Sequence, residues 1–560
     1  MVDHPWLACY DDHVPARLEY PATDLHTQFA AAAERFAALP ALKFLGLTLT
    51  YRQLSEHIER LAAALHARGL ARGDRVVLLL PNCPQFVIAF YALQRLGAVA
   101  VLANPLNVER ELLFKFRDSG AKGVILLDLL SQRLNAIRSE LNLAFVVYTG
   151  IGEFLPFPKN LLYPVVRRLD KKLPAVHIPG DARTLRLQKL LAEVHPGPPH
   201  PPIEPEDTAA LLYSGGTTGI AKGIMLSHRA LVANLTQVCA WVALDEADSL
   251  LAVLPLFHGF GMSVCMNAPL SRGASVVLLP KFDPAQVVAT IEKDRPTLFA
   301  GVPTMFIALK ALPELGQRTL TSLRGIFAGA APLPLEVMRE FEQLTGASLI
   351  EGYGLTEAVT AIACNPARGV RKPGTVGIPF PDVEWRLVDL MDGTAEVPQG
   401  EPGEVVLRGP DLMTGYWNQP EKTAEVLRDG WLHTGDVGVL DADGYLTIVD
   451  RIKDLVIVGG FNVFPSEIDA VLHQHPKVLE GVAVGLPHPT QGEFIKAYVV
   501  PRPGQTLTGD EVIGFCRENL SLYMVPREVD VRTELPKSAI GKVLRRQLRE
   551  EAISGQGEQD

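Results

Sequence analysis

Apolar positions in the first third of the chain alternate between two periods. Thr50 and Gln53 have the spacing of a capping box, so a helix is expected to begin after Thr50. The apolar face of this helix repeats at helical spacing and comprises Leu54, Ile58, Leu61 and Leu65. The apolar run 76–80 predicts a strand, residues 86–93 a second helix and residues 99–103 a second strand. Such alternation indicates an α/β fold with parallel sheets covered by helices on both faces.

The composition and the predicted secondary structure change further along the chain. Residues 196–205 are rich in proline and predict a linker. From about 373 to 445, short β runs alternate with turns, which indicates a small β subdomain. After Asp450 follows a block of about 110 residues with strands and helices of its own, enough for a separate small domain. We therefore expect a first domain over 1–449 that includes the β subdomain, and a second domain over 450–560.

Composition narrows the class of protein. The 560 residues are too many for one hydrophobic core, and a net charge of −10 argues against a nucleic-acid partner, which normally meets a basic surface. The six cysteines are scattered without a Cys-x-x-Cys pair, as in a reduced, cytoplasmic enzyme. The N-terminus lacks the pattern of a secretory signal, and no apolar stretch reaches the roughly 18 residues of a membrane span. We therefore expect a cytoplasmic protein without membrane-spanning segments.

The most informative segment covers residues 213–223, Tyr-Ser-Gly-Gly-Thr-Thr-Gly-Ile-Ala-Lys-Gly. Its glycines allow positive φ, and successive N–H groups in such a loop can surround an anion. The preceding apolar run 209–212 predicts a buried strand. Because the segment lacks the end of a Walker A motif, it predicts a phosphate site of another kind rather than a flexible surface loop. The residues concerned are Ser214, Gly215, Gly216, Thr217, Thr218, Gly219 and Lys222.

This loop resembles the phosphate loop of the adenylate-forming superfamily, which includes acyl-CoA synthetases, adenylation domains of peptide synthetases and luciferases. The resemblance extends over nearly the whole chain, because further motifs follow in the family's order. It implies a large N-terminal region of two doubly wound α/β lobes with a β subdomain, and a small mobile α+β C-terminal lid domain. It also implies ATP and coenzyme A as cosubstrates and Mg²⁺ as the cofactor.

A second motif, residues 353–357, reads Tyr-Gly-Leu-Thr-Glu. Mg²⁺ is usually held by one or two carboxylates together with substrate phosphates, and Glu357 suits that role. In the resembled family Thr356 stands at a phosphate contact and Tyr353 packs on adenine. The run 329–333, Gly-Ala-Ala-Pro-Leu, resembles the other wall of the adenine pocket. The resemblance thus extends the nucleotide site to Gly329, Ala330, Ala331, Glu351, Gly352 and Gly354.

Motifs near the C-terminal end complete the resemblance. Residues 429–436, 450–454 and 459–467 together resemble the long signature of fatty acyl-CoA synthetases. This signature implies a ribose contact by Asp436, a nucleotide contact by Arg451 and a hinge between the two domains at Lys453. On the coenzyme A side it implies Gly459, Gly460 and Phe461.

The run 536–545 reads Pro-Lys-Ser-Ala-Ile-Gly-Lys-Val-Leu-Arg. An ammonium group on a glycine-led loop can reach a cleft and stabilise charge that develops on an α-phosphate. The resemblance implies that Lys542 in this run is the catalytic lysine.

The acid substrate is predicted from two further similarities. Residues 255–261 resemble the segment beside the acyl or aryl pocket, where Gly259 and Phe260 flank His258; this histidine either gates the acyl site or is structural. The opening of the chain resembles bacterial long-chain fatty-acid–CoA ligases at residues 5–6, 80–86, 104–106 and 109–111. We therefore expect activation of a long-chain fatty acid to acyl-adenylate and then to acyl-CoA, with release of pyrophosphate and AMP.

Alternatives stay open at this point. The acid could be medium-chain or aryl, as in 4-coumarate-type ligases, or the enzyme could load a carrier protein from acyl-AMP instead of making acyl-CoA. A luciferase-like oxygenase would share every adenylation motif. A non-catalytic nucleotide-binding scaffold is opposed by the presence of Glu357, Asp436 and Lys542 together. The sequence does not predict the oligomeric state.

Residues 154–172 combine apolar and basic side chains. Two apolar runs, at 154–157 and 161–166, precede four cations, Arg167, Arg168, Lys171 and Lys172. One interpretation is a segment bound to an anionic membrane, which predicts peripheral contact with the inner membrane face and meets long-chain acids where they are concentrated. The alternative is a core-packed loop with a solvated charged end.

Overall fold

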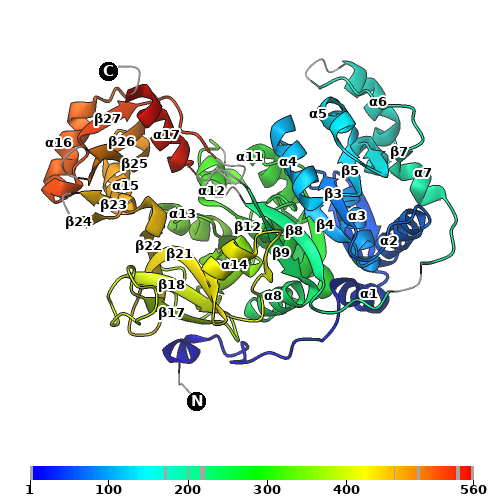
Figure 1. Ribbon diagram of the computed structural model, residues 1–560, viewed down its shortest axis with the longest axis horizontal. Coiled ribbons are helices and arrows are strands. Elements are labelled where there is room, and N and C mark those ends of the chain that lie inside the picture. Colours follow the sequence, from blue (N-terminus) through cyan, green and yellow to red (C-terminus); the bar gives the residue numbers. More distant parts are fainter. Residues whose placement is uncertain are drawn as a thin grey trace. The chain divides into compact units, whose positions relative to one another are not determined.

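The computed structural model describes residues 4–169, 173–198, 201–214, 221–313, 315–458, 461–488, 492–537 and 543–556. The chain forms two compact units (Figure 1). The first comprises residues 1–384 and 408–430, and the second comprises 385–407 and 431–560. The segment 408–430 thus leaves the expected β subdomain and groups with the first unit. The predicted boundary at 449/450 stays a prediction, and strand β22 (Leu446–Arg451) runs through it.

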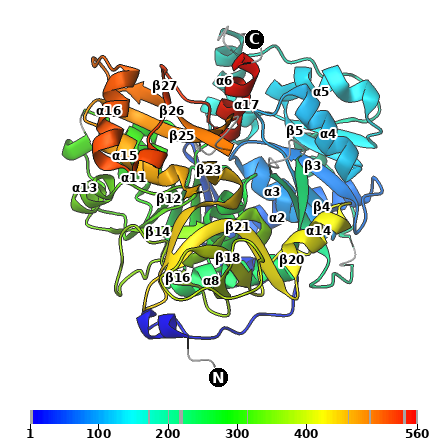
Figure 2. The same ribbon diagram turned by 60° about the vertical axis from the view of Figure 1, so that its left-hand side comes forward.

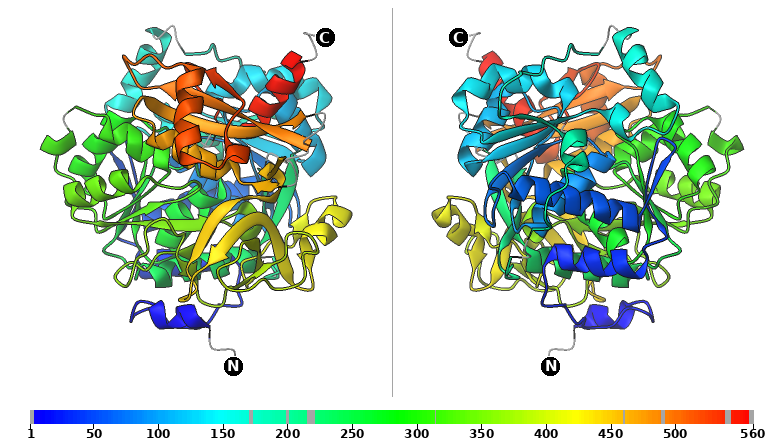
Figure 3. Two further views of the ribbon diagram at one scale, coloured as in Figure 1. Left: turned by 90° about the vertical axis from the view of Figure 1, so that its left-hand side faces the viewer. Right: turned by 90° about the vertical axis from the view of Figure 1, so that its right-hand side faces the viewer.

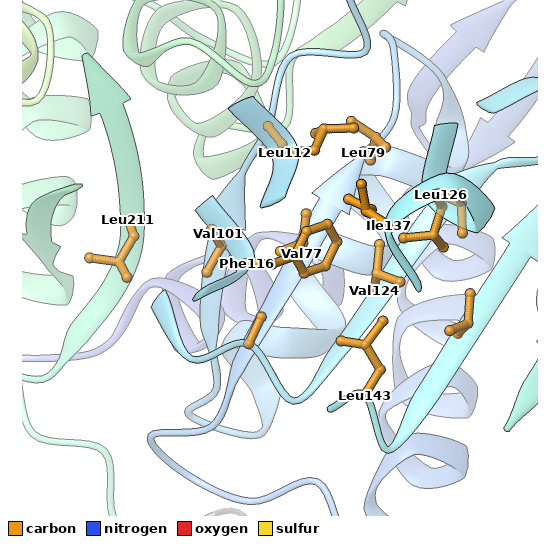
Figure 4. Packing of buried hydrophobic residues seen from close by; sticks show 14 of the residues in the cluster. Val77, Leu79, Val101, Leu112, Phe116, Val124, Leu126, Ile137, Leu143 and Leu211 are labelled. Carbon is orange, nitrogen blue, oxygen red and sulfur yellow. The ribbon is translucent and has the colours of Figure 1, made fainter. Parts of the chain in front are cut away.

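The first unit contains an eight-stranded sheet that is parallel except at one edge. Its strand order is β19 (Gly415–Tyr416), β9 (Lys222–Ser227), β8 (Thr208–Ser214), β4 (Val99–Leu102), β3 (Arg75–Leu79), β5 (Gly123–Leu127), β6 (Phe145–Thr149) and β7 (Thr184–Arg186). Strands β9 and β19 join it in antiparallel pairing. On one face, alternate residues of the parallel strands pack against the helices α4 (Glu109–Ser119) and α5 (Ser131–Ile137) (Figure 4). The strands predicted at 76–80, 99–103 and 209–212 are therefore confirmed.

A nine-stranded sheet forms the second lobe of this unit. Its order is β16 (Ile378–Pro379), β15 (Ala361–Cys364), β14 (Ser348–Gly354), β13 (Gly325–Ala328), β12 (Leu298–Gly301), β10 (Ser249–Ala252), β11 (Ser275–Leu278), β1 (Pro40–Phe44) and β2 (Leu47–Thr50). The six strands from β14 to β1 are parallel, and the strands at both ends are antiparallel. Two parallel sheets with helical connections confirm the expected pair of α/β lobes.

Helices α2 (Tyr51–His66), α3 (Pro84–Arg95) and α8 (His228–Trp241) form much of the packing between the lobes. Helix α2 begins with the predicted capping box of Thr50 and Gln53. Nearly every residue of α3 and α8 is buried, so both helices are covered on all sides. The other helices of the unit are α1 (Leu25–Arg35), α6 (Lys159–Leu169), α7 (Leu187–Ala192), α9 (Gly259–Met262), α10 (Ala268–Ser271), α11 (Pro284–Asp294), α12 (Pro303–Lys310), α13 (Leu335–Thr345) and α14 (Pro420–Val426).

One buried asparagine joins the two sheets. Asn82 follows β3 of the first sheet, and its Nδ2 donates to the carbonyl oxygens of Ala252 and Leu254 at 3.1 and 2.9 Å, where β10 of the second sheet ends. Its Oδ1 accepts from the Leu256 N–H at 2.9 Å. Since Asn82 comes three residues after the end of β3 and bonds the last residue of β10, the carboxyl ends of two parallel sheets meet there, which is where α/β folds place their ligands.

The second unit contains strands of two sheets, which pair antiparallel except for one parallel pair in the second sheet. The strands β17 (Glu384–Val388), β18 (Gly403–Arg408), β21 (Trp431–Leu440) and β22 form one. The other has the order β24 (Phe461–Val463), β23 (Val456–Val458), β26 (Gly492–Pro501) and β25 (Val478–His488), with β27 (Glu528–Val531) beside β26. Figures 2 and 3 show this second sheet in orange.

Alternate residues of β25 and β26 pack into two different hydrophobic cores. Ala483, Ile495 and Ala497 pack on the side of α15 (Pro465–Gln474) and α16 (Gly509–Asn519). Their neighbours Val484, Phe494 and Tyr498 pack on the other side, with Leu548 of α17 (Arg545–Gln556). Helices thus cover both faces of this sheet, and the expected α+β character of the C-terminal part is confirmed.

Candidate functional site

The glycine-rich segment connects two antiparallel strands. Strands β8 and β9 are in register from Thr208 opposite Ser227 to Ser214 opposite Lys222. The predicted phosphate-loop residues Gly215, Gly216, Thr217, Thr218 and Gly219 lie outside the described residues. Their two flanks, Ser214 and Lys222, face each other as the last cross-strand pair before the loop.

A tyrosine connects this hairpin with the predicted magnesium ligand. The Lys222 Nζ lies 4.5 Å from the centroid of the Tyr416 ring, and the Tyr416 hydroxyl donates to Glu357 Oε1 at 3.0 Å. Burial and the adjacent Glu357 carboxylate raise the pKa of Tyr416, so the hydroxyl keeps its proton and donates. Tyr416 is held because β19 pairs with β9 and because the Met413 N–H donates to the Glu357 carbonyl at 2.7 Å.

Strand β14 carries Tyr353 and leads into η7 (Thr356–Ala358), where Thr356 and Glu357 stand. It pairs with β13 on one side and, in antiparallel fashion, with β15 on the other. A Cβ at Gly354 would lie 1.3 Å from the carbonyl oxygen of Thr360, so no other residue fits there. The predicted motif therefore has a glycine at this position for a steric reason.

Beside β14 lies an apolar cavity with about 790 Å³ of empty space, its open mouth included. Seven predicted site residues line it, namely His258, Phe260, Gly329, Ala330, Gly352, Tyr353 and Gly354. The remaining lining is almost entirely apolar and includes Val238, Trp241, Leu244, Leu250, Phe327 and Phe380. The predicted acyl-pocket and adenine-pocket residues thus share one cavity.

The geometry of His258 restricts its protonation state. Its Nδ1 accepts from the Phe260 N–H at 3.3 Å and caps α9, which leaves the ring proton on Nε2. Burial lowers the pKa of His258 to about 4, so the imidazole is neutral at physiological pH. The next residue, Gly259, packs against Val359, since a Cβ at Gly259 would lie 2.2 Å from the Val359 carbonyl oxygen. A neutral His258 can donate one hydrogen bond into the cavity without adding charge to it.

Two of the residues predicted around the adenine, Glu351 and Ala331, do not line this cavity. Glu351 accepts from the Leu333 N–H at 3.0 Å and the Gly374 N–H at 3.3 Å, and burial raises the pKa of its carboxyl group. It borders a separate, more polar cavity together with residues of α13. Ala331 is exposed in the loop after β13. In this structure Glu351 braces the wall formed by residues 329–333 from behind.

In the second unit, neighbouring strands hold the predicted ribose and nucleotide contacts together. The register of β21 and β22 places Asp436 opposite Arg451, and Arg451 Nε lies 2.8 Å from Asp436 Oδ1. Asp436 is only 3% exposed, so it is not the solvent-facing residue of an ordinary β-turn. Lys453 follows in η8 (Ile452–Asp454), where partial desolvation and the Arg451 charge lower its pKa. The predicted residues Gly459, Gly460 and Lys542 lie outside the described residues, as does the side chain of Phe461.

A buried ion-pair group anchors the chain just after Lys542. Arg545, three residues further on, bonds Asp469 and lies 3.7 Å from Asp450 through Nη1. The Asp450 Oδ2 also accepts from the Ser466 N–H at 2.9 Å. Arg545 and Asp469 are thereby paired inside the unit, and α17 starts from a fixed point. This group was not predicted, because sequence spacing does not reveal a contact between residues 76 positions apart.

The carboxylates of the described residues form no cluster of three or more that could hold a metal ion by themselves. Glu357 fits a Mg²⁺ site of the kind that takes one protein carboxylate and completes its shell with phosphate oxygens and water. Its second oxygen, Oε2, is not used in the bond to Tyr416. Glu357 is therefore the residue that would hold the ion when nucleotide is bound.

A buried polar network behind the cavity was not predicted from the motifs. Asn234 of α8 donates through Nδ2 to the Ala361 carbonyl at 2.7 Å and to Asp411 Oδ2 at 3.2 Å, and it accepts from the Ser263 hydroxyl at 2.6 Å. Ala361 lines the cavity. Asp411 is completely buried, and its Oδ1 has no hydrogen-bond partner among the described residues. Burial raises the pKa of Asp411 to about 7.

Two α/β lobes, a hairpin that carries the glycine-rich segment, an apolar cavity beside β14 and the Glu357 carboxylate just after this strand are the features of an enzyme that binds a nucleotide next to an apolar substrate. The chain belongs to the AMP-binding enzyme family, whose model matches residues 29–417, and the model of the C-terminal domain of AMP-binding enzymes matches residues 467–542. Both matches agree with the prediction from the motifs.

Three relatives illustrate the similarity. The long-chain-fatty-acid–CoA ligase of Bacillus subtilis strain 168 is 40% identical, with 98% of each chain covered. The crystal structure of ATP-bound MatB from Rhodopseudomonas palustris superimposes with a TM-score of 0.83 at 31% identity, covering 94% of this chain and 99% of the other. The anthranilate CoA ligase AuaEII in complex with anthranoyl-AMP gives 0.84 at 29% identity, covering 96% and 99%.

Replacing the buried carboxyl group should change the pH dependence of stability. Burial raises the pKa of Asp411 from the ordinary aspartate value of 3.8 to about 7, so the folded protein binds the extra proton and loses stability as pH rises through this window. Asp411→Asn removes that loss, which is at most about 4 kcal/mol at about 1.4 kcal/mol per pKa unit. The unfolding temperature of wild type should fall between pH 5 and pH 8, and that of Asp411→Asn should fall markedly less. The exposed Asp12→Asn serves as the matched control, and parallel curves for wild type and Asp411→Asn would disprove the assignment.

Proposed function

We propose that this protein is an ATP-dependent ligase that converts a fatty acid to its acyl-CoA. In the first half-reaction the acid carboxylate attacks the α-phosphorus of ATP, which gives acyl-adenylate and pyrophosphate. In the second, the thiol of coenzyme A attacks the acyl carbon and AMP leaves. The observation that carries the proposal is the arrangement along β14, where an apolar cavity and the Glu357 carboxylate, bonded to Tyr416, belong to one strand and its end.

Each part of the nucleotide is assigned to residues of one predicted motif. The loop 214–219 with Lys222 takes the phosphates, and Tyr353 with the wall 329–331 takes the adenine. Asp436 accepts the ribose hydroxyls, and Arg451 Nε, 2.8 Å from Asp436 Oδ1, holds the carboxylate in position for that contact. Glu351 and Gly352 support the adenine wall, and Thr356 donates to a phosphate.

Catalysis is assigned to positioning and charge stabilisation, because neither half-reaction needs a protein nucleophile. Lys542 stabilises the charge that develops between the α-phosphate and the carboxylate. Glu357 holds Mg²⁺, which when bound neutralises phosphate charge. Tyr416 orients the Glu357 carboxylate, and its ring lies against the Lys222 ammonium group.

A long-chain fatty acid is the substrate best supported by the cavity and by the family resemblance. The cavity lining is apolar, and His258 adds one neutral donor near Phe260. A saturated chain suits such a lining, whereas an aryl acid with a hydroxyl group would need a polar partner. AMP release from a panel of medium-chain, long-chain and hydroxycinnamic acids tests this, with and without coenzyme A. Acyl-adenylate formation without coenzyme A-dependent turnover would point to a carrier-protein ligase instead.

The Lys542 assignment gives a direct prediction. Lys542→Ala should lower pyrophosphate release more than about a hundredfold, since one well-placed charge contributes about 3 kcal/mol or more to the transition state. The same variant should form acyl-CoA from supplied acyl-adenylate at a near-normal rate. Lys537→Ala is the matched control, because Lys537 pairs with Glu480 at 2.6 Å. Near-normal pyrophosphate release by Lys542→Ala would rule the assignment out.

Lys453 is proposed as a hinge that lets one domain serve both half-reactions, with Lys542 presented in the first and the segment 459–461 in the second. Hinges absorb a change in φ and ψ at a few residues. Lys453→Pro fixes φ and should spare pyrophosphate release but reduce acyl-CoA formation at least about tenfold. Lys453→Ala, which keeps the backbone free, should leave both steps closer to wild type. Equal loss of both steps in the proline variant would indicate misfolding and refute the hinge.

We also propose that α6 binds an anionic membrane surface. No residue of α6 is buried, and its exposed aliphatic side chains form one face: Leu161, Leu162, Val165, Val166 and Leu169, each at least 56% exposed. The other face is attached, since the Tyr163 ring packs over Gly152 and Arg167 Nη1 lies 2.7 Å from Asp128 Oδ2. The core-packed alternative therefore applies to Phe154 but not to the helix. Within the part of the chain that the structure describes, no helix is long and apolar enough to cross a bilayer.

Sedimentation with vesicles tests this surface. Wild type should pellet with phosphatidylglycerol vesicles at low salt and not with phosphatidylcholine vesicles. Leu161→Ser combined with Val165→Ser should abolish pelleting, and Arg168→Glu should weaken it at least about fivefold, since each cation near the surface contributes about 1 kcal/mol. Arg52→Glu makes the same charge change on α2 and is the control. Wild type that stays in the supernatant with anionic vesicles would show that the acid is taken from solution.

A further inference from the structure

An aromatic pair forms part of the wall of the apolar cavity. Trp241 is the last residue of α8, is 2% exposed and lines the cavity together with Phe380. The two rings lie 5.0 Å apart between centroids at an angle of 47°. The Trp241 Nε1 donates to the Asn365 carbonyl at 3.1 Å, which fixes the plane of the indole. A bulky side chain that is held at both its ring and its nitrogen is a rigid stop.

The N-terminal segment lies directly behind this stop. The Tyr10 ring meets the Trp241 indole edge to face, with centroids 5.3 Å apart and an angle of 84°. The Tyr10 hydroxyl donates to the Pro379 carbonyl at 2.7 Å, and His13 Nε2 donates to the Trp241 carbonyl at 3.1 Å. In Figure 1 this segment runs from the N-terminal label past α8 before it reaches α1.

Further bonds tie the same segment to the loops that carry the cavity wall. The Asp11 carboxylate accepts from the N–H groups of Ala367 and Arg368 at 2.9 and 3.0 Å. Further on, the Leu18 N–H and the Tyr20 hydroxyl both reach Asp382 Oδ2, at 2.8 and 2.9 Å. The residues bonded by the segment, Ala367, Arg368 and Asp382, precede and follow Phe380 in the sequence. Residues 10–20 therefore form a strap that holds Phe380 and Trp241 against each other from outside.

We propose that Trp241, held by this N-terminal strap, is the chain-length stop of the acyl site. The inference rests on the proposed function and deepens it, because it assigns the determinant of substrate length within that cavity. The carboxylate end of the acid lies toward His258 and Tyr353, and the terminal methyl group reaches Trp241 and Phe380. Acids longer than the cavity bind only when the Trp241 side chain moves. A smaller side chain at position 241, or weaker contacts between Trp241 and the strap, therefore extends the chain length of the acids that bind.

The first experiment compares acids from hexanoate to eicosanoate by kcat/KM for pyrophosphate release. Trp241→Leu should shift the optimum to longer acids and raise the ratio of the longest to the optimal wild-type acid about tenfold or more, since one methylene in an apolar pocket changes discrimination by roughly 10- to 200-fold. Tyr10→Phe, which removes the bond to Pro379, should shift the ratio in the same direction by a smaller factor. Trp6→Phe is the matched control, because Trp6 belongs to the same N-terminal region but does not line the cavity.

The second experiment does not depend on turnover. The chain has five tryptophans, so the fluorescence difference between wild type and Trp241→Phe isolates the signal of Trp241. A fatty acid brominated at its terminal carbon should quench this signal, whereas the same acid brominated next to the carboxylate should not. Equal quenching by both acids, or none while both displace a bound fatty acid, would overturn the proposal even if Trp241→Leu folds poorly.

The outcomes separate this proposal from the one on which it rests. If wild type releases no pyrophosphate with any fatty acid, the proposed function is wrong. If wild type is active but the length ratio of folded Trp241→Leu equals that of wild type, the proposed function stands and the stop is refuted.

Discussion

The functional architecture depends on one steric constraint, the close passage of β14 beside the carbonyl of Thr360. A Cβ at Gly354 would overlap that oxygen, so the strand can pair with β15 only because this residue has no side chain. The pairing holds Tyr353 at the apolar cavity and leads the chain directly into η7, where Glu357 meets Tyr416. Any side chain at position 354 would separate the two strands, and both the cavity wall and the position of the carboxylate would change with them.

Polar groups around the cavity are arranged so that charge stays outside it. His258 is neutral because burial disfavours its cation and because its Nδ1 accepts a backbone hydrogen bond. Asp411, behind the wall, is stabilised in its protonated form by burial. An apolar substrate in this cavity therefore meets apolar groups and single neutral donors.

Secondary structure was predicted correctly where it depends on a local pattern. The capping box at Thr50 and the strand before the glycine-rich loop followed from spacing and periodicity, because each depends on neighbours within a few residues. The two α/β lobes followed from the family resemblance. Glu351 was assigned to the nucleotide wall, yet its carboxylate bonds the backbone at residues 333 and 374. Tyr416 and Trp241 were not identified at all. Trp241 ends a helix that is buried on every side, so no polar face marked the cavity, and Tyr416 acts through a residue 59 positions away.

The sequence by itself determined the class of fold, the family and the residue types of the phosphate and metal sites, because glycines, hydroxyls and carboxylates in short motifs specify local geometry and chemistry. Only the tertiary structure decided which residues share the apolar cavity, which aromatic rings pack in its wall and which tyrosine bonds the Glu357 carboxylate. These features arise where segments hundreds of residues apart come together, as when residues 10–20 meet residues 365–382. Such contacts depend on the packing of whole sheets and helices, which no short pattern along the chain encodes.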